Sequence, residues 1–279
     1  MGISRRGAIK AAVATAVGLG TGTIAYGIAY ERHRVRRVEL ELAVTGLPEA
    51  LANLRIGLIT DVHHSESVSA EDVSLAVRLL RDANPDVVVL GGDYVTFGDR
   101  RYVNPVAELL APLADAPHGS FAVLGNHDDD REMPAALAKR GFVVLKDQRT
   151  SLVIRGETLD VAGIRFWTRR PSDLARILAG TSGTTLLLAH DPRRLVEAAA
   201  LDVQLVLSGH THGGQVVLPG VGALAGRKFP VLAGVGTEEN ATVFVSRGVG
   251  TVYMPVRVNC PPEVVILTLQ RSGRGSAKV

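Results

Sequence analysis

The amino-acid sequence predicts an α/β fold, with one domain over residues 38–270 built from two packed β-sheets and helices on the outside. Short runs rich in Val, Ile and Leu alternate with longer stretches in which apolar residues recur at helical spacing. Continuous apolar runs such as VVVL and LLLAH are typical of strands covered on both faces. Hydrophobic residues make up 46% of the chain and charged residues 21%, which indicates a globular rather than a disordered protein.

The individual elements follow from these patterns in chain order. Strands at 38–42 and 56–60 precede a helix at 70–83, and a strand at 87–90 precedes a helix at 105–113. Next come a strand at 121–124, a helix at 134–140, strands at 152–154 and 159–162, and a helix at 173–178. The last elements are a strand at 185–189, a helix at 192–200, and strands at 203–208, 242–246 and 264–269. Residues 271–279, RSGRGSAKV, are expected to form a disordered tail.

Residues 1–30 are expected to direct the chain to the cell membrane. The stretch 11–30 carries no charged residue, and a helix of this length spans about 30 Å, the thickness of the hydrocarbon core of a bilayer. Arg5 and Arg6 precede it as in a twin-arginine export signal, and a plain signal anchor is the alternative. Residues 31–37 are expected to form a basic juxtamembrane linker. The domain would lie outside the cytoplasm, or be secreted if the leader is cleaved.

The basic residues are concentrated at the two ends of the chain. Residues 1–37 carry a net charge of +6 and residues 271–279 carry +3, although the whole chain carries only +3. The predicted domain therefore has a net charge of −6, which disfavours a nucleic-acid-binding face. The single cysteine, Cys260, excludes an intramolecular disulfide and a cysteine-rich zinc site.

Residue types that bind metal ions follow the carboxyl ends of five predicted strands. In chain order they are Asp61 and His63, Asp93, Asn126 with His127 and Asp128, His190, and His210 with His212. The carboxyl ends of strands are where α/β folds build their sites. In Asp61-x-His63 and His210-x-His212, an extended backbone would place both side chains on one face, so that both reach one site. Carboxylate, imidazole and amide oxygen together suit Mn, Fe, Zn or a similar divalent ion.

The order of these motifs is more specific than any one of them. They run D-x-H, G-G-D, G-N-H-D, H and G-H-x-H, with glycines that let the backbone approach bound ions closely. This set resembles the calcineurin-like metallophosphoesterase family over residues 38–270. The stretches GHTHGGQ (209–215), SRGVG (246–250) and NCPPE (259–263) are similar to its bacterial exported or membrane-anchored branch. The resemblance implies two mixed β-sheets flanked by helices (αββα), and the candidate lid between Gln215 and Thr242 looks short for that branch.

The resemblance also implies a centre of two divalent metal ions. One ion would be held by Asp61, His63, Asp93 and His212. The other would be held by Asp93, Asn126, His190 and His210, with Asp93 bridging the two. Two such ions about 3.5–4 Å apart would acidify a shared water, and the resulting hydroxide would attack phosphorus in line. His127 would stabilise the phosphoryl oxygens and donate a proton to the leaving oxygen, with Asp128 orienting its imidazole.

These expectations predict a dimetal-dependent phosphoric ester hydrolase at the cell membrane. Its phosphate-ester substrate would be lipid-linked or a nucleotide sugar. One alternative is a pyrophosphohydrolase of the UDP-sugar-lipid type, and another is a non-catalytic, metal-stabilised binding protein tethered to the membrane. The complete ligand set and His127 argue against the latter. Arg247 and Arg257 could contact phosphate or form structural pairs, and Arg227 with Lys228 in the candidate lid could contact lipid or substrate.

Overall fold

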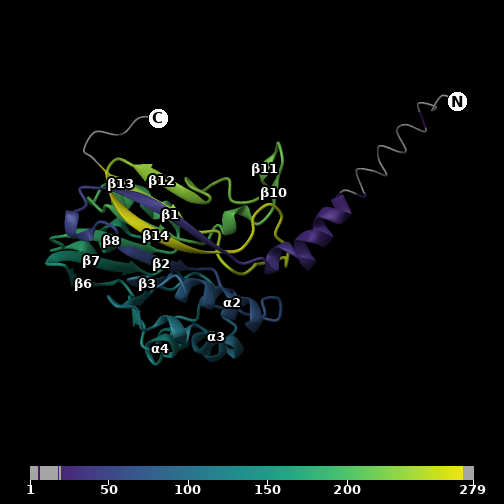
Figure 1. The fold of residues 1–279 in the computed structure, drawn as a ribbon, viewed down its shortest axis with the longest axis horizontal. Coiled ribbons are helices and arrows are strands. Elements are labelled where there is room, and N and C mark those ends of the chain that lie inside the picture. The colour runs from purple at the N-terminus through teal and green to yellow at the C-terminus, as the bar shows by residue number, and fades with distance from the viewer. Residues whose placement is uncertain (1–5, 7–17, 19, 273–279) are drawn as a thin grey trace.

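The computed structural model describes residue 6, residue 18 and residues 20–272 (Figure 1). Arg5, residues 11–17 and residues 273–279, which belong to the expected leader and tail, lie outside the described residues. Residues 20–29 are helical and project from one end of the domain. Within the described part of the chain, no helix is both long enough and apolar enough to cross a membrane.

Two six-stranded mixed sheets form the centre of the fold (Figure 1). The first contains, in spatial order, β1 (Arg36–Thr45), β14 (Glu263–Ser272), β2 (Arg55–Ile59), β3 (Val87–Leu90), β4 (Ser120–Ala122) and β5 (Val143–Val144). The second contains β12 (Gly234–Glu238), β13 (Ala241–Val245), β9 (Leu205–Ser208), β8 (Thr184–Ala189), β7 (Glu157–Ile164) and β6 (Gln148–Ile154). Strands β2, β3 and β4 run parallel, as do β7, β8, β9 and β13. Each sheet therefore collects several carboxyl ends at one edge.

The two sheets pack face to face through an apolar layer. Its side chains are almost completely buried, and they include Ile56, Val89, Phe121, Leu186 and Leu205. Every residue of β3 and β8 is buried, which confirms that the continuous apolar runs are strands covered on both faces. Removing this apolar surface from water is the main force that holds the sheets together.

Helices cover the outer face of each sheet. On the first sheet these are α2 (Ala70–Arg81), α3 (Val103–Leu110) and α4 (Glu132–Ala138), and on the second α5 (Pro171–Leu178) and α6 (Leu195–Ala199). The α2 helix begins after Ser69, whose side chain accepts a hydrogen bond from the N–H of Asp72 at 3.2 Å. Its buried Val73, Val77 and Leu80 recur at helical spacing and face the sheet. The predicted αββα order is therefore confirmed.

The structure departs from the predicted elements mainly in short or glycine-rich segments. β5, β10 (Val217–Leu218), β11 (Gly222–Ala223) and β12 had no predicted counterpart, because two-residue strands carry no periodic signal and glycine disfavours strands. The helix expected at 192–200 divides into a 3-10 turn, η5 (Pro192–Arg194), and α6. The other 3-10 turns are η1 (Glu31–His33), η2 (Glu49–Leu51), η3 (Arg100–Tyr102), η4 (Ala111–Leu113) and η6 (His212–Gly214).

The folded domain extends beyond both of its predicted ends, residues 38 and 270. The strand β14 runs to Ser272, so the first two residues of the expected tail pair with β1. The expected linker 31–37 contains η1, with a buried Glu31, and the start of β1 at Arg36. These residues belong to the folded domain rather than to a free connection.

Candidate metal centre

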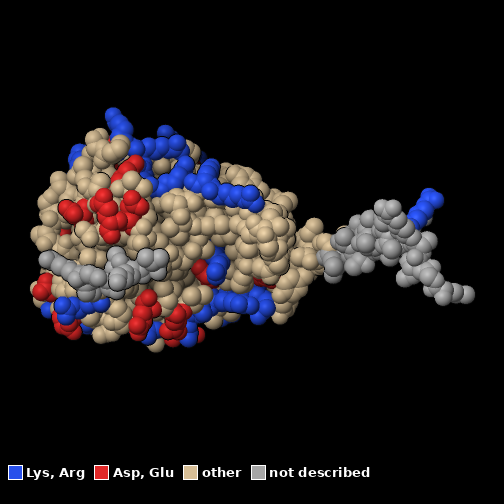
Figure 2. All heavy atoms as spheres, turned by 90° about the horizontal axis from the view of Figure 1, so that it is seen from above, with Lys and Arg blue, Asp and Glu red and all other residues tan. Residues whose placement is uncertain are grey.

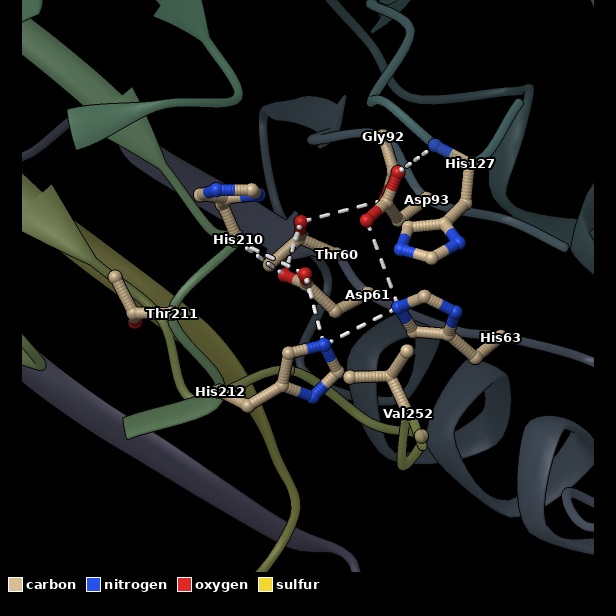
Figure 3. Close-up of polar contacts among 12 residues, drawn as sticks. Thr60, Asp61, His63, Gly92, Asp93, His127, His210, Thr211, His212 and Val252 are labelled. Carbon is tan, nitrogen blue, oxygen red and sulfur yellow. Dashed lines mark hydrogen bonds and ion pairs between the residues drawn. The ribbon is translucent and has the colours of Figure 1, made fainter. Parts of the chain in front are cut away.

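The polar residues that follow the strands converge at one edge of the two sheets. From the first sheet, Asp61 and His63 follow β2, Asp93 follows β3, and Asn126 and His127 follow β4. From the second sheet, His190 follows β8, and His210 and His212 follow β9. Figure 3 shows the carboxylates of Asp61 and Asp93 surrounded by imidazole rings from both sheets. The site is therefore built at the carboxyl ends of parallel strands, as expected.

The donor atoms form two groups, each compact enough to hold a metal ion. In one group, atoms of Asp61, His63 and His212 lie within 4.8 Å of one another. In the other, the same holds for Asp93, His190 and His210. His210 and His212 thus belong to different groups, which is the division that the family resemblance implied. Their φ angles of 70° for His210 and 52° for His212 show that this segment is not extended, so alternation along a strand does not apply.

Asp93 lies between the two groups. Its Oδ2 is 3.1 Å from Nε2 of His190 and 3.5 Å from Nε2 of His63. The Nε2 atom of His63 is in turn 3.1 Å from that of His212, which lies 3.4 Å from Oδ1 of Asp61 (Figure 3). All five of these side chains are buried. A continuous row of nitrogen and oxygen donors in a buried site fits a pair of cations.

Several buried donor atoms lack a hydrogen-bond partner. Of the five such atoms in the described residues, three belong to predicted ligands: Oδ1 of Asn126, Nε2 of His190 and Nδ1 of His212. Nδ1 of His190 donates to the carbonyl oxygen of Gly91 at 2.8 Å, which leaves Nε2 as the position facing Asp93. A histidine held through one nitrogen by a carbonyl is typical of metal ligands. The residues present therefore fit the two divalent ions that the sequence implied.

Five of the seven predicted ligands have a left-handed backbone conformation. Their φ angles are 51° for Asp61, 49° for His63, 54° for Asp93, 70° for His210 and 52° for His212. Such angles cost about 1–3 kcal/mol each outside glycine. Hydrogen bonds between the loops hold them: the N–H of His63 donates to the carbonyl of Asp93 at 3.0 Å, and that of His210 donates to the Asp61 carboxylate at 2.9 Å. Strain concentrated in this way is typical of a functional centre.

Two glycines make room for the carboxylates. A Cβ atom on Gly125 would lie 2.0 Å from Oδ1 of Asp93, and one on Gly209 would lie 2.1 Å from Oδ2 of Asp61. Both distances are far shorter than a van der Waals contact. A side chain at either position would therefore displace a carboxylate. These two glycines allow the backbone to approach the carboxylates closely, as the motifs predicted.

The electrostatics indicate a site built around positive charge. Burial lowers the pKa of His63 to about 3 and that of His210 to about 4, so both rings are neutral near pH 7. Burial also opposes a charge on His190, but Asp93 and Asp61 outweigh it and raise its pKa to about 10. In the metal-free protein, a protonated His190 thus supplies a positive charge beside the carboxylates of Asp93 and Asp61. Divalent ions supply the same charge and bind neutral imidazole.

His127 lies at the edge of the centre with one ring nitrogen already engaged. Its Nδ1 accepts a hydrogen bond from the N–H of Phe97 at 3.1 Å, so the neutral ring carries its proton on Nε2. Burial lowers the pKa of His127, which favours this neutral form near pH 7. The ring stands edge-on to His63 with centroids 5.0 Å apart, and Figure 3 places it beside Asp93. His127 can therefore offer an N–H donor at the centre.

Asp128 does not make the contact expected of it. Its carboxylate accepts hydrogen bonds from the N–H groups of Asp93 and Tyr94, both at 2.8 Å, and of Gly125 at 2.9 Å. No hydrogen bond or ion pair joins it to His127 in the described part of the chain. Backbone donors bind a carboxylate strongly, so Asp128 ties the loop after β4 to the loop after β3. Its geometry is that of a positioning residue for Asp93 rather than of an imidazole partner.

Two arginines that could have contacted phosphate make structural contacts instead. Arg257 is fully buried and donates to the carbonyl oxygens of Arg247, Gly248, Gly250 and Cys260. Arg247 pairs with Glu263 through Nη1 and Oε2 at 2.9 Å. Because the N–H of Gly250 donates to the carbonyl of Asp61 at 2.7 Å, these contacts fix the C-terminal loop against the metal centre.

Sequence reasoning missed three residues beside the centre. The hydroxyl of Thr60 donates to Oδ2 of Asp61 at 2.8 Å, and its place directly before the aspartate was the available signal. Phe97 and Tyr253 are 66% and 80% exposed, with ring centroids 4.9 Å and 6.3 Å from that of His127. No motif marked these aromatic residues, because they meet only when distant loops come together.

Known proteins resemble this chain over most of its length. The calcineurin-like phosphoesterase family matches residues 54–214. The uncharacterized metallophosphoesterase YkuE of Bacillus subtilis is 27% identical, with 95% of this chain and 94% of that protein covered. Phosphodiesterase YaeI of Escherichia coli is 32% identical, with 78% and 83% covered. A Danio rerio protein called a transmembrane protein with metallophosphoesterase domain is 30% identical, with 88% of this chain and 60% of that protein covered.

The matched segment coincides with the metal centre. Residues 54–214 contain all seven predicted ligands and His127, and they make up more than half of the chain. The two compact donor groups support a binuclear centre at the same place. The chain therefore belongs to the calcineurin-like phosphoesterase family and is a metal-dependent phosphoesterase.

Proposed function

We propose that this phosphoesterase uses two divalent ions held by the seven predicted ligands, with Asp93 bridging them. Asp61, His63 and His212 complete one position, and Asn126, His190 and His210 complete the other. The observation that carries this proposal is the place of Asp93 Oδ2, within 3.5 Å of Nε2 in both His63 and His190. When bound, the two ions would neutralise phosphate charge and lower the pKa of a water molecule that attacks phosphorus.

His127 has the geometry of the proton donor in this reaction. The N–H of Phe97 occupies Nδ1, so Nε2 carries the transferable proton, and Figure 3 places the ring beside Asp93. Proton transfer of this kind contributes about 10²–10⁴-fold to a rate. Asp128 is a positioning residue, since its carboxylate holds the backbone of Asp93 in its strained conformation.

The substrate is a phosphate ester at a membrane surface, lipid-linked or a nucleotide sugar. The uncharged stretch 11–30 next to Arg5 and Arg6 supports a membrane anchor or twin-arginine leader outside the cytoplasm. The Danio rerio relative is called a transmembrane protein and the Escherichia coli relative a phosphodiesterase. We therefore favour a diester over a monoester or pyrophosphate, with the domain anchored through its N-terminal segment.

The test is hydrolysis of bis-p-nitrophenyl phosphate and p-nitrophenyl phosphate by the detergent-purified full chain. Activity is measured without metal and with added Mn, Zn or Fe, in parallel with bound-metal analysis. Asp93→Ala should lose both metal and turnover, whereas His127→Gln should keep its metal and lose turnover about 10²-fold or more. His118→Gln, a histidine in a distant turn, is the matched control. Full turnover by His127→Gln would refute its role, and full metal content in Asp93→Ala would refute the bridge.

A further inference from the structure

The hairpin of β10 and β11 is uncharged and exposed. Residues 216–226, VVLPGVGALAG, contain no side chain with a charge or a hydrogen-bonding group. Val221 at its tip is 58% exposed and Leu224 is 55% exposed. Two backbone hydrogen bonds close the turn, since the N–H of Val221 donates to the carbonyl of Leu218 at 3.1 Å and that of Leu224 to the carbonyl of Val216 at 3.0 Å. A segment of this kind tolerates an environment without water.

The hairpin lies beside the N-terminal helix. Leu218 and Pro219 line one cavity together with Gly18, Gly22 and Tyr26 of that helix. At about 1.5 Å per residue, Gly18 is about 12 Å farther from the domain along the helix than Tyr26. Leu218 and Pro219 therefore lie beside the part of the helix between Gly18 and Tyr26, and the surroundings of the helix there also meet this side of the hairpin.

The helix and the hairpin are both fixed to the domain. A Cβ atom on Gly27 would lie 2.6 Å from the carbonyl oxygen of Arg257, so the helix touches the C-terminal loop without space for a side chain. The buried carboxylate of Glu31 accepts from the N–H of Cys260 at 2.7 Å. On the hairpin side, the N–H of Val217 donates to the carbonyl of Val258 at 2.9 Å. The direction of both elements is thus set by the fold.

The hairpin also begins and ends at the metal centre. It starts directly after η6, which contains His212, and it returns through Arg227 and Lys228 to Phe229. The ring of Phe229 lies 5.3 Å from that of His210. Neither Arg227 nor Lys228 forms an ion pair with another described residue. In Figure 2 the end of the domain beside the N-terminal helix shows mostly uncharged atoms, with basic side chains nearby.

We propose that the β10–β11 hairpin inserts its tip into the interfacial region of a lipid bilayer with anionic headgroups. Val221 and Leu224 would enter the apolar boundary, and Arg227 and Lys228 at the base would contact headgroup phosphates. The metal centre would then face the membrane surface, where a lipid-linked ester is presented to it. This inference rests on the proposed function only for the nature of the substrate, since the contact with the bilayer is a separate property.

The test uses the full chain reconstituted into vesicles of phosphatidylcholine and phosphatidylglycerol. An environment-sensitive fluorophore is attached to Leu224→Cys and, as the matched control, to Val153→Cys. Val153 is 73% exposed on β6, which Figure 1 places at the end away from the N-terminal helix. The native Cys260 is 1% exposed, and the unsubstituted chain controls for its labelling. Spin-labelled lipids in the vesicles report contact with the acyl region.

In vesicles, the label at residue 224 should shift its emission to shorter wavelength and be quenched by the spin-labelled lipid, whereas the label at residue 153 should do neither. Equal behaviour of the two labels would overturn the proposal. A shift without lipid quenching would also overturn it, because a second copy or another protein would then cover the hairpin. Hydrolysis of the soluble diester by the same samples is scored separately, so a failed enzyme assay and a failed membrane contact remain distinguishable.

Discussion

Replacing Gly209 with alanine tests whether the Asp61 carboxylate must lie where the structure places it. The added Cβ would be 2.1 Å from Oδ2 of Asp61 and 2.3 Å from Oγ1 of Thr60. Ordinary carbon–oxygen contact needs about 3.5 Å, so these groups must move by about 1 Å. Neither is a free end, because Oδ1 of Asp61 accepts from the N–H of His210 at 2.9 Å and Oδ2 accepts from Thr60 at 2.8 Å.

The expected magnitude follows from these contacts. Overpacking a filled site costs about 1–3 kcal/mol, and weakening a hydrogen bond to a charged group adds about 1.5 kcal/mol. We therefore expect the free energy of unfolding to fall by about 2.5–4.5 kcal/mol. A ligand displaced by about 1 Å exceeds the tolerance of a metal site, which is about 0.2 Å. Affinity for the ion at the Asp61 position should fall by at least about 10–100-fold.

The assay combines metal titration by calorimetry with thermal unfolding of the metal-free protein. Gly22→Ala is the matched control, since a Cβ atom there meets nothing within 4 Å. The control should bind both ions and should not lose stability, because alanine favours a helix over glycine. Parent-like affinity for both ions in Gly209→Ala would refute the reasoning, because the crowded carboxylate would then be irrelevant to ligation.

Three further predictions concern Asp128, Arg257 and His190. Asp128→Asn should unfold about 1–3 kcal/mol more easily in urea, since an amide nitrogen in place of Oδ1 cannot accept from the N–H of Tyr94; unchanged stability with an altered pH–rate profile would instead favour a role in proton transfer. Arg257→Met should cost about 3 kcal/mol or more even without metal, because it orphans buried carbonyls; a variant as stable as the parent would contradict this. In metal-free protein, His190 has a pKa raised to about 10, so its contribution is complete below pH 6.5 and is lost as pH rises toward 10. Urea unfolding from pH 7 to 10 should show this decline, and bound metal should abolish it.

Much of the centre could be predicted from the sequence because its ligands follow apolar strands. A continuous run such as VVVL must be buried, and the polar residue after it must appear at the edge of a sheet. That reasoning located Asp61, Asp93, His190 and His210. The glycines beside them were expected to permit close approach, and Gly125 does so at the Asp93 carboxylate.

The local geometry could not be predicted in the same way. Alternation along an extended backbone predicted that His210 and His212 lie on one face, but both residues have left-handed φ angles, so the segment is not extended. The role of Asp128 could not be predicted either, because its partners include the N–H of Asp93, 35 residues away in the chain. A residue's backbone angle and its remote partners depend on contacts that a linear pattern does not contain.

The sequence by itself determined the alternation of apolar strands with helices, the apolar core and which candidate metal ligands follow the strands, because each depends on local periodicity and residue chemistry. Only the tertiary structure decided which backbone angles and hydrogen bonds hold the donors together and where the β10–β11 hairpin points. It also showed that Glu31 and Gly27 fix the N-terminal helix to the C-terminal loop. These features arise from pairing between the two ends of the chain, as in β1 with β14, and such long-range contacts are selected by packing of the whole fold.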